Sequence, residues 1–378
     1  MKVALVCHKY GIPLDDPCCY PLGFMMISAV LKQAGHDVTV YNENLGANDV
    51  DTVLSGLLDR QHCDAVLFTG FEEFLPYIKR DANICKQRGI KTILGGALAS
   101  YKSVEMLDVA DTVIVGEGED VICQALDSTG IVQGSEPDLN TLPYPDYEGF
   151  GIDEYHRRHT TRYMGVLTSR GCPYSCKFCA QTCAYQARGL DGVFEEIDLY
   201  KERYGVQMIV FNDNTLNIRK DRFLEICEGM AKRDILWSAA IRCDNFDEEM
   251  AIAAKKSGCS YFVVGVESFS QARLDMMDKR IKVDDIHNCL DLLHRYNINY
   301  HGNVLMGLPG DTPEIMLDEL ERIPSWFKIF PCFVQNFVGT QMGGKDKLDK
   351  NQRKAFAMLF KQVIQRGGKY MYPELKAA

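Results

Sequence analysis

The chain has 378 residues, of which 46% are hydrophobic, and it carries a formal net charge of −10. This length and apolar content suffice for two domains with buried cores. The acidic balance argues against nucleic acid or an anionic membrane surface as a partner.

The short apolar runs and the scattered cysteines of the chain indicate a cytoplasmic protein with reduced thiols and no membrane partner. No apolar run approaches the roughly 20 residues that cross a bilayer. The opening sequence MKVALVC is typical of a buried first strand and not of a signal peptide. The 15 cysteines are odd in number and scattered, unlike the disulfide framework of a small secreted domain.

The first part of the chain alternates short apolar strands with helical patterns, and glycines mark the joints. Strands are predicted at residues 3–7, 37–41, 65–69, 92–94 and 112–115. Helices are predicted at 22–33, 50–58, 75–87 and from 120 onward. This order predicts a doubly wound, Rossmann-like parallel α/β sheet over residues 1–130, which would bind ligands at the carboxyl ends of its strands.

The rhythm breaks over residues 131–160, where Pro137, Pro143 and Pro145 predict a linker between domains. Alternation then resumes over residues 161–335. Strands are predicted at 164–168, 208–211, 237–241, 261–266, 300–306 and 330–334, with helices at 194–203, 222–232, 248–257, 284–295 and 313–323. Six strands with crossover helices predict a full or partial barrel. Residues 336–378 are expected to form a short helical segment and tail.

Three cysteines follow the first strand of this second part. Cys172, Cys176 and Cys179 are separated by three and then two residues. Thiolates are the usual ligands of iron–sulfur clusters, and three of them leave one iron open to a cofactor or substrate. The alternative is a zinc loop completed by a fourth ligand such as Cys183, but zinc sites of this kind usually bring two matched pairs of ligands.

This motif, with the aromatic Phe178 before its last cysteine, resembles that of the radical S-adenosylmethionine (SAM) superfamily across residues 161–335. The resemblance implies a partial (β/α)6 radical SAM barrel, a [4Fe–4S] cluster on the three cysteines, and SAM as cofactor. It also implies SAM contacts from residues that follow successive strands. These are Phe178, Asn212, Asp213, Asn214, Arg242, Glu267, Ser268 and Gly307.

The chemistry of SAM agrees with that set, because an acid suits its ammonium, an arginine its carboxylate and a second acid its ribose hydroxyls. Asn212-Asp213-Asn214 departs from the more common Gly-Gly-Glu of the superfamily, and an aspartate after a strand is often only a turn residue. In the reaction that the resemblance implies, the reduced cluster cleaves SAM to a 5′-deoxyadenosyl radical. A flavodoxin or ferredoxin would supply the electron.

The first part resembles the cobalamin-binding domain often fused to such barrels, through Pro21-Leu22-Gly23, Gly35-His36-Asp37 and Leu94-Gly95-Gly96. The implied cobalamin contacts are Thr69, Gly70, Gly95, Gly96, Gly116, Glu117 and Gly118. The Asp-x-His-x-x-Gly motif that supplies a cobalt ligand elsewhere is absent. A degenerate domain that serves only as a lid or docking surface is the alternative.

A few residues of the first part have no clear assignment. His8 follows the first strand and is either a ligand, a polar contact or an ordinary loop histidine. Cys7, Cys18 and Cys19 match no family pattern and are interpreted as structural. Tyr10, Phe71, Glu72 and Glu73 are candidate wall residues for a substrate between the domains, because they follow strands.

The domain order favours cobalamin-dependent methylation of a small or medium-sized substrate. A second hypothesis keeps the architecture but replaces methyl transfer with cyclisation, rearrangement or oxidation. A third, from another class, is a non-catalytic cobalamin or redox sensor. A methylthiotransferase is disfavoured, because no trio of extra cysteines is recognisable near the N-terminus.

Overall fold

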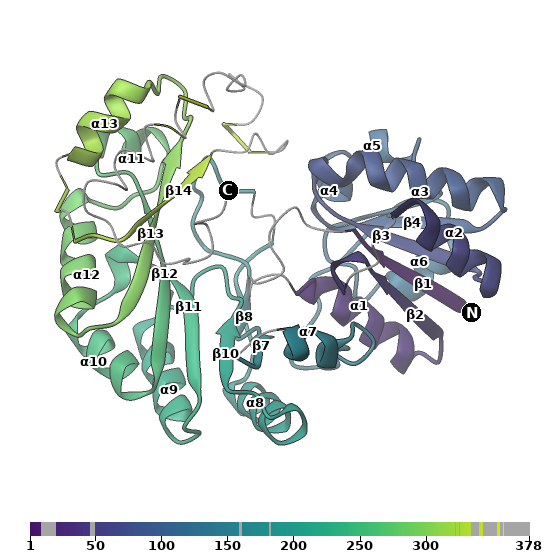
Figure 1. Cartoon of the computed structure of the whole chain (residues 1–378), viewed down its shortest axis with the longest axis horizontal. Coiled ribbons are helices and arrows are strands. Elements are labelled where there is room, and N and C mark those ends of the chain that lie inside the picture. The colour runs from purple at the N-terminus through teal and green to yellow at the C-terminus, as the bar shows by residue number, and fades with distance from the viewer. Residues whose placement is uncertain are drawn as a thin grey trace. The chain divides into compact units, whose positions relative to one another are not determined.

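The computed structural model describes residues 1–8, 20–45, 50–158, 161–180, 183–321, 323–324, 326–333, 340–342, 354–355 and 358. The chain divides into two compact units (Figure 1). The N-terminal unit comprises Met1–Gly165, Gln186–Gly192 and Arg203–Gly205, and the C-terminal unit comprises the remainder from Val166. Within the described ranges, every helix is too short or too polar to cross a membrane.

The N-terminal unit is built on a six-stranded sheet whose paired strands are all parallel. Its strand order is β2-β1-β3-β4-β5-β6, so the order reverses between β1 and β3, where a doubly wound sheet forms its ligand crevice. The strands are β1 (Lys2–Cys7), β2 (Asp37–Asn42), β3 (Ala65–Thr69), β4 (Lys91–Gly95), β5 (Thr112–Val115) and β6 (Gly130–Gln133).

This sheet confirms the predicted Rossmann-like fold class. Strand β6 was not predicted, since it begins at Gly130 and only Ile131 and Val132 of its four residues are apolar. The helices of this unit are α1 (Leu22–Gln33), α2 (Val50–Arg60), α3 (Leu75–Gln87), α4 (Gly96–Tyr101), α5 (Ser103–Met106), α6 (Ile122–Asp127) and α7 (Ile152–Arg158), with 3-10 turns η1 (Glu43–Leu45) and η2 (Glu72–Phe74). Helices α4, α5 and α7 were not predicted, because one or two turns present no repeating apolar face.

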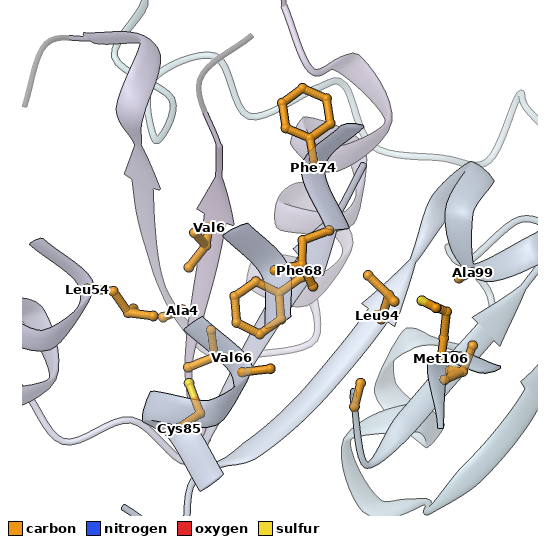
Figure 2. Close-up of a cluster of buried hydrophobic side chains, with 14 of the residues drawn as sticks. Ala4, Val6, Leu54, Val66, Phe68, Phe74, Cys85, Leu94, Ala99 and Met106 are labelled. Carbon is orange, nitrogen blue, oxygen red and sulfur yellow. The ribbon is translucent and has the colours of Figure 1, made fainter. Parts of the chain in front are cut away.

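A buried cluster holds helices against one face of this sheet (Figure 2). Alternate residues of the strands, such as Val6, Val66 and Phe68, point to the same face because the strand repeat is two residues. They pack on Leu54 of α2 and Cys85 of α3. Burial of each large side chain contributes about 1.5–3 kcal/mol, which fixes the strands so that their carboxyl ends share one edge.

The C-terminal unit contains a second six-stranded sheet of order β14-β13-β12-β11-β10-β7. Because spatial order follows chain order, each strand adds beside the previous one, as in the predicted partial (β/α)6 barrel. The strands are β7 (Tyr163–Val166), β10 (Met208–Phe211), β11 (Leu236–Arg242), β12 (Cys259–Glu267), β13 (Asn299–Met306) and β14 (Ile329–Phe333). Two short strands, β8 (Ser169–Arg170) and β9 (Gln186–Ala187), form a separate pair.

The helices that connect these strands run along the outside of the sheet (Figure 1). They are α8 (Leu190–Tyr204), α9 (Lys220–Ala231), α10 (Glu248–Lys256), α11 (Gln271–Met276), α12 (Val283–Arg295) and α13 (Pro313–Glu321), with the 3-10 turn η3 (Cys243–Asn245). Trp237 of β11 anchors the core, with ring centroids 5.7 Å from Phe211 and 5.6 Å from Phe262. The predicted segment 336–378 lies almost entirely outside the described residues.

Candidate active site

The loop that carries the three predicted cluster ligands has a fixed backbone. Gly171 has a φ of +79°, and any side chain there would collide with the carbonyl oxygen of Ala184. The amide of Lys177 donates to the carbonyl of Met277 at 2.9 Å, and the amide of Cys179 donates to that of Cys176 at 3.0 Å. The loop is therefore held by backbone hydrogen bonds.

Of the cysteines in this loop, Cys172 and Cys176 are half-buried and Cys179 is exposed. A single zinc ion with Zn–S bonds of about 2.3 Å gathers its thiolates within roughly 4 Å of one another. Among the described cysteines, no three ligand atoms of this loop, Cys183 included, lie within 4.8 Å of each other.

Asp213, at the end of β10, holds the chain that enters this loop. Its carboxylate accepts hydrogen bonds from the amide and hydroxyl of Thr168, at 2.8 and 2.6 Å, and from the hydroxyl of Ser169 at 2.5 Å. Burial raises the pKa of Asp213, and these hydrogen bonds oppose the rise. Its predicted neighbours differ in exposure, since Asn212 is half-buried and Asn214 is exposed. The predicted strand 164–168 ends at Val166, because Thr168 bonds to Asp213 instead of a strand.

Arg242, at the end of β11, lies beside the cysteine loop. Its Nε and Nη2 atoms donate to the two carboxylate oxygens of Asp244, each at 3.0 Å. Its Nη1 atom is 3.9 Å from Cys176 Sγ, and its guanidinium carbon lies 3.7 Å from the centre of the Tyr174 ring. Burial lowers the pKa of Arg242, but Asp244 outweighs burial and the net shift is upward. The group therefore remains a cation next to a predicted cluster ligand.

Asn217 fixes the turn that carries Arg242, although the sequence interpretation did not include it. Its side-chain oxygen accepts from the Arg242 amide at 2.9 Å, while its Nδ2 donates to the carbonyls of Arg242 and Asn245 at 2.9 and 2.7 Å. The only sequence signal for this role is its place in the polar run after β10. A pattern of residues does not reveal which carbonyls such an amide reaches.

Glu267 ends β12 in an unusual conformation, with a φ of +64° after an irregularity in the strand register at Gly265. Its Oε1 atom lies 2.8 Å from Lys279 Nζ, and both side chains are buried. Lys279 was also absent from the sequence interpretation, because a lysine among charged residues before a helix is usually solvated.

Ser268 and Gly307 join a third polar network. The Ser268 hydroxyl donates to Glu319 Oε1 at 2.6 Å, and the Gly307 amide donates to Asp311 Oδ2 at 2.9 Å. Arg273 connects the two acids, with contacts of 3.1 Å to Asp311 and 3.2 Å to Glu319. This network fixes the loops after β12 and β13.

The predicted cobalamin residues follow β3, β4 and β5 in the N-terminal unit. Gly96 has a φ of +82°, and a side chain there would collide with the Thr69 hydroxyl. Ser100 connects two turns, since its hydroxyl donates to the Gly96 carbonyl and accepts from the Gly116 amide, each at 3.0 Å. In contrast, a Cβ at Gly95 would meet, among the described residues, only Ile114, at 4.0 Å. Gly95 therefore leaves open space at the ligand edge of the sheet. Glu117 and Gly118 continue the turn after β5, and Gly70 accepts a hydrogen bond from the Leu98 amide at 3.1 Å.

His8 is an internal polar contact. Its Nε2 atom is 2.9 Å from Asp81 Oδ2, and only 3% of the residue is exposed. Arg80 donates to the other oxygen of Asp81 at 2.8 Å. Of the candidate wall residues, Phe71, Glu72 and Glu73 are exposed. Tyr10 lies outside the described residues, as do Cys18 and Cys19.

Two family models match the chain. The model of the Radical SAM superfamily matches residues 166–323, and that of the B12 binding domain matches residues 16–126. Residues 166–323 form a radical SAM domain, and residues 16–126 form a B12-binding domain. Both matched segments agree with the resemblances drawn from the residues.

Relatives of this radical SAM enzyme include methyltransferases. An uncharacterized methyltransferase of Pyrococcus horikoshii is 24% identical over 333 residues, which cover 78% of this chain and 71% of that protein. The bacteriochlorophyllide d C-12(1)-methyltransferase of Chlorobaculum tepidum is 26% identical over 338 residues, covering 85% and 72%. The structure of the radical SAM methyltransferase TsrM from Kitasatospora setae, with cobalamin and a [4Fe–4S] cluster bound, shares the fold with a TM-score of 0.73. The two sequences are 16% identical, and the alignment covers 91% of this chain and 74% of the TsrM chain.

The cofactors of the two domains are a [4Fe–4S] cluster, SAM and cobalamin. The residues of this radical SAM enzyme fit them. The cysteine loop offers three thiols, and Arg242 offers a buried cation beside that loop for an anionic group. The open space at Gly95 allows a flat ligand to approach the backbone of the sheet edge.

Proposed function

We propose that this enzyme uses cobalamin to methylate an unactivated carbon of a small or medium-sized substrate. The observation that carries the proposal is the presence in one chain of a three-thiol loop at the strand ends of a barrel and an open glycine edge on a B12-binding sheet. When bound, the cluster and SAM supply a hydrogen-abstracting radical, and cobalamin supplies a transferable methyl group.

In this proposal, Cys172, Cys176 and Cys179 hold the cluster. Arg242 binds the SAM carboxylate, because it stays charged beside the loop. The Glu267 carboxylate accepts hydrogen bonds from the ribose hydroxyls of SAM. The remaining proposed SAM contacts are Phe178, Asn212, Asn214 and Gly307, together with Asp213 and Ser268, whose oxygens are also used within the chain.

The proposed cobalamin contacts are the turns after β3, β4 and β5. They comprise Thr69, Gly70, Gly95, Gly96, Gly116, Glu117 and Gly118. We assign the cobalamin-binding domain to residues 1–130, a linker to 131–160, the barrel to 161–335 and a C-terminal segment to 336–378.

A flavodoxin or ferredoxin is the proposed electron donor. The exposure of Cys179 supports it, because a cluster bound there has one ligand at the protein surface. Electron transfer would then need only a transient encounter at that surface.

Anaerobic reconstitution, followed by iron, sulfide, zinc and cobalt analysis and a visible spectrum, tests the cofactors. Zinc in the cysteine loop would contradict the proposal. A Cys176→Ala variant is the matched control, and we expect it to lose iron but to keep cobalamin, because the two cofactors lie in different domains.

A turnover assay tests the reaction. The reduced enzyme is incubated with SAM carrying a deuterated methyl group and with a small-molecule extract of its source cells. We expect equal amounts of 5′-deoxyadenosine and S-adenosylhomocysteine, and a product that carries the label. Formation of 5′-deoxyadenosine without S-adenosylhomocysteine would instead identify a cyclisation, rearrangement or oxidation.

A further inference from the structure

Lys279 is a buried cation that the SAM assignments leave without a role. Only 5% of the residue is exposed, although lysine is rarely buried and a desolvated ammonium costs several kcal/mol unless it is paired. Its partner is Glu267, at 2.8 Å. Burial lowers the pKa of Lys279, but Glu267 outweighs burial and the net shift is upward. The ammonium therefore keeps its charge inside the barrel unit.

The backbone around this ion pair is strained on both sides. Asp278 and Arg280, which flank the lysine, have φ values of +51° and +57°, and Glu267 has a φ of +64°. For a residue other than glycine, this left-handed conformation costs about 1–2 kcal/mol of conformational free energy. Such strain gathers at functional sites, where it holds a group in one position. Asp278 follows helix α11, where a left-handed residue is an ordinary helix end, so the strain lies at Arg280 and Glu267, which both adjoin the ion pair.

The turn at residues 277–280 also contacts the cysteine loop. The Lys279 carbonyl accepts from Arg242 Nη2 at 3.0 Å, and its Nζ lies 5.7 Å from the centre of the Phe178 ring. The Met277 carbonyl accepts from the Lys177 amide at 2.9 Å. Lys279 thus connects Glu267, Arg242 and the loop between the last two cysteines.

We propose that Lys279 is a positioning residue, which fixes the Glu267 carboxylate for SAM and places a permanent positive charge beside the cluster. The inference rests on the proposed SAM site and deepens it. Reduction adds a negative charge to the cluster, so a nearby buried cation favours the reduced state. The same cation keeps Glu267 in one orientation, so the carboxylate does not have to be ordered when the ribose binds.

The test compares two neighbouring cations in the reconstituted, anaerobic, full-length protein. Lys279→Met removes the buried charge and keeps the side-chain length. Arg280→Gln removes an adjacent charge whose side chain is 68% exposed and therefore screened by water. Lys279→Arg keeps the charge. Equilibrium dialysis gives the dissociation constant for SAM, and an EPR-monitored redox titration without SAM gives the midpoint potential of the cluster.

For Lys279→Met, we expect SAM affinity to fall about tenfold, equivalent to about 1.4 kcal/mol, and the midpoint potential to become more negative. Lys279→Arg should retain the potential, and Arg280→Gln should change neither quantity. Unchanged affinity and potential in Lys279→Met would overturn the proposal, as would an equal shift in Arg280→Gln.

Glu267→Gln provides a second route if Lys279→Met does not load iron. It leaves the lysine charge unbalanced, so the midpoint potential should become more positive while SAM affinity falls. A shift toward negative potential in Glu267→Gln would reject the role of the charge. These measurements need no substrate, so an enzyme that binds SAM but forms no S-adenosylhomocysteine refutes methyl transfer and leaves this inference standing.

Discussion

Asp213 accepts three hydrogen bonds from Thr168 and Ser169 at a position that water does not reach. The sequence interpretation assigned this carboxylate to the SAM ammonium, whereas the structure gives it contacts within the chain. A buried carboxylate that serves only its own chain can be replaced by an amide, because the two hydroxyls can rotate and accept from the new NH2 group. The two roles therefore differ in how they respond to substitution.

For Asp213→Asn, we expect the free energy of unfolding to change by less than about 1 kcal/mol and SAM affinity to fall about tenfold, because the amide keeps the internal hydrogen bonds but loses the charge that binds the ammonium. Asp213→Ala should lose about 1–3 kcal/mol, because the Thr168 amide is left buried without an acceptor. Chemical denaturation and equilibrium dialysis measure the two quantities. Unchanged SAM affinity in Asp213→Asn would limit the Asp213 carboxylate to its contacts within the chain.

Gly95 and Gly96 are neighbours in sequence with different physical constraints. Gly95→Ala meets open space, so we expect an unchanged melting temperature and weaker cobalamin binding, because the Cβ occupies the ligand edge. Gly96→Ala combines a φ of +82° with a collision at Thr69, and should lose about 1–2 kcal/mol or more. Thermal denaturation and absorbance titration with cobalamin separate these effects. Normal cobalamin affinity in Gly95→Ala would argue against a ligand at this edge.

Asp81 introduces a pH dependence into the N-terminal unit. Burial raises the pKa of this carboxyl, but the hydrogen bonds from His8 and Arg80 outweigh burial, so the folded-state pKa lies below the ordinary 3.8. The stabilisation that ionised Asp81 gives the folded protein is complete above the pKa of this carboxyl in the unfolded chain. It is lost as the pH falls from there through the folded-state pKa. In wild type, the urea concentration at the unfolding midpoint should therefore decline below pH 3.8. We expect a smaller decline in Asp81→Asn. An identical decline in wild type and variant would contradict this account.

At the scale of secondary-structure elements, the turn after β11 depends on the side-chain amide of Asn217. Asn217 holds both ends of η3 and so determines where Arg242 lies beside the cysteine loop. The strand supplies the position of the Arg242 backbone, while Asp244 supplies the orientation of its guanidinium. The functional cation is therefore placed by two residues that do not follow from the strand pattern.

We expect Asn217→Ala to destabilise the protein by about 2–4 kcal/mol, because the buried Arg242 amide and two carbonyls lose their partner. SAM affinity should fall as well, since Arg242 is no longer fixed. Asn245→Ala serves as a comparison, because Asn245 contacts the same turn through the carbonyl of Ile218. Denaturation curves and SAM binding that match wild type in Asn217→Ala would refute this role.

At the scale of the whole molecule, each unit has its own core. Phe68 packs in the N-terminal sheet, and Trp237 packs among aromatic rings in the C-terminal sheet. Truncating either side chain to alanine should cost about 3–5 kcal/mol. We expect hydrogen exchange to increase mainly in the substituted unit, so that Phe68→Ala keeps its iron and Trp237→Ala keeps its cobalamin. Uniform loss of protection across both units would show that they unfold together.

Much of this architecture followed from local patterns. The periodicity of apolar residues predicts strands such as β1 and β3 and long amphipathic helices such as α1 and α3. Strand β6, with only two apolar residues, and helix α4, with fewer than two turns, lack that signal and were missed. The cysteine spacing and the glycines at the strand ends were readable because each depends on residues close together in the chain.

By itself, the sequence determined the two parallel α/β sheets and the three-thiol loop, since short-range periodicity and spacing encode both, and its resemblance to known families implied the cofactor classes. Only the tertiary structure decided which polar groups are bonded to distant parts of the chain. Asp213 is bonded over 44 and 45 residues, and Lys279 reaches Glu267 across 12. Such partners depend on the three-dimensional packing of distant segments and the burial of their charges, which no local pattern of residues contains.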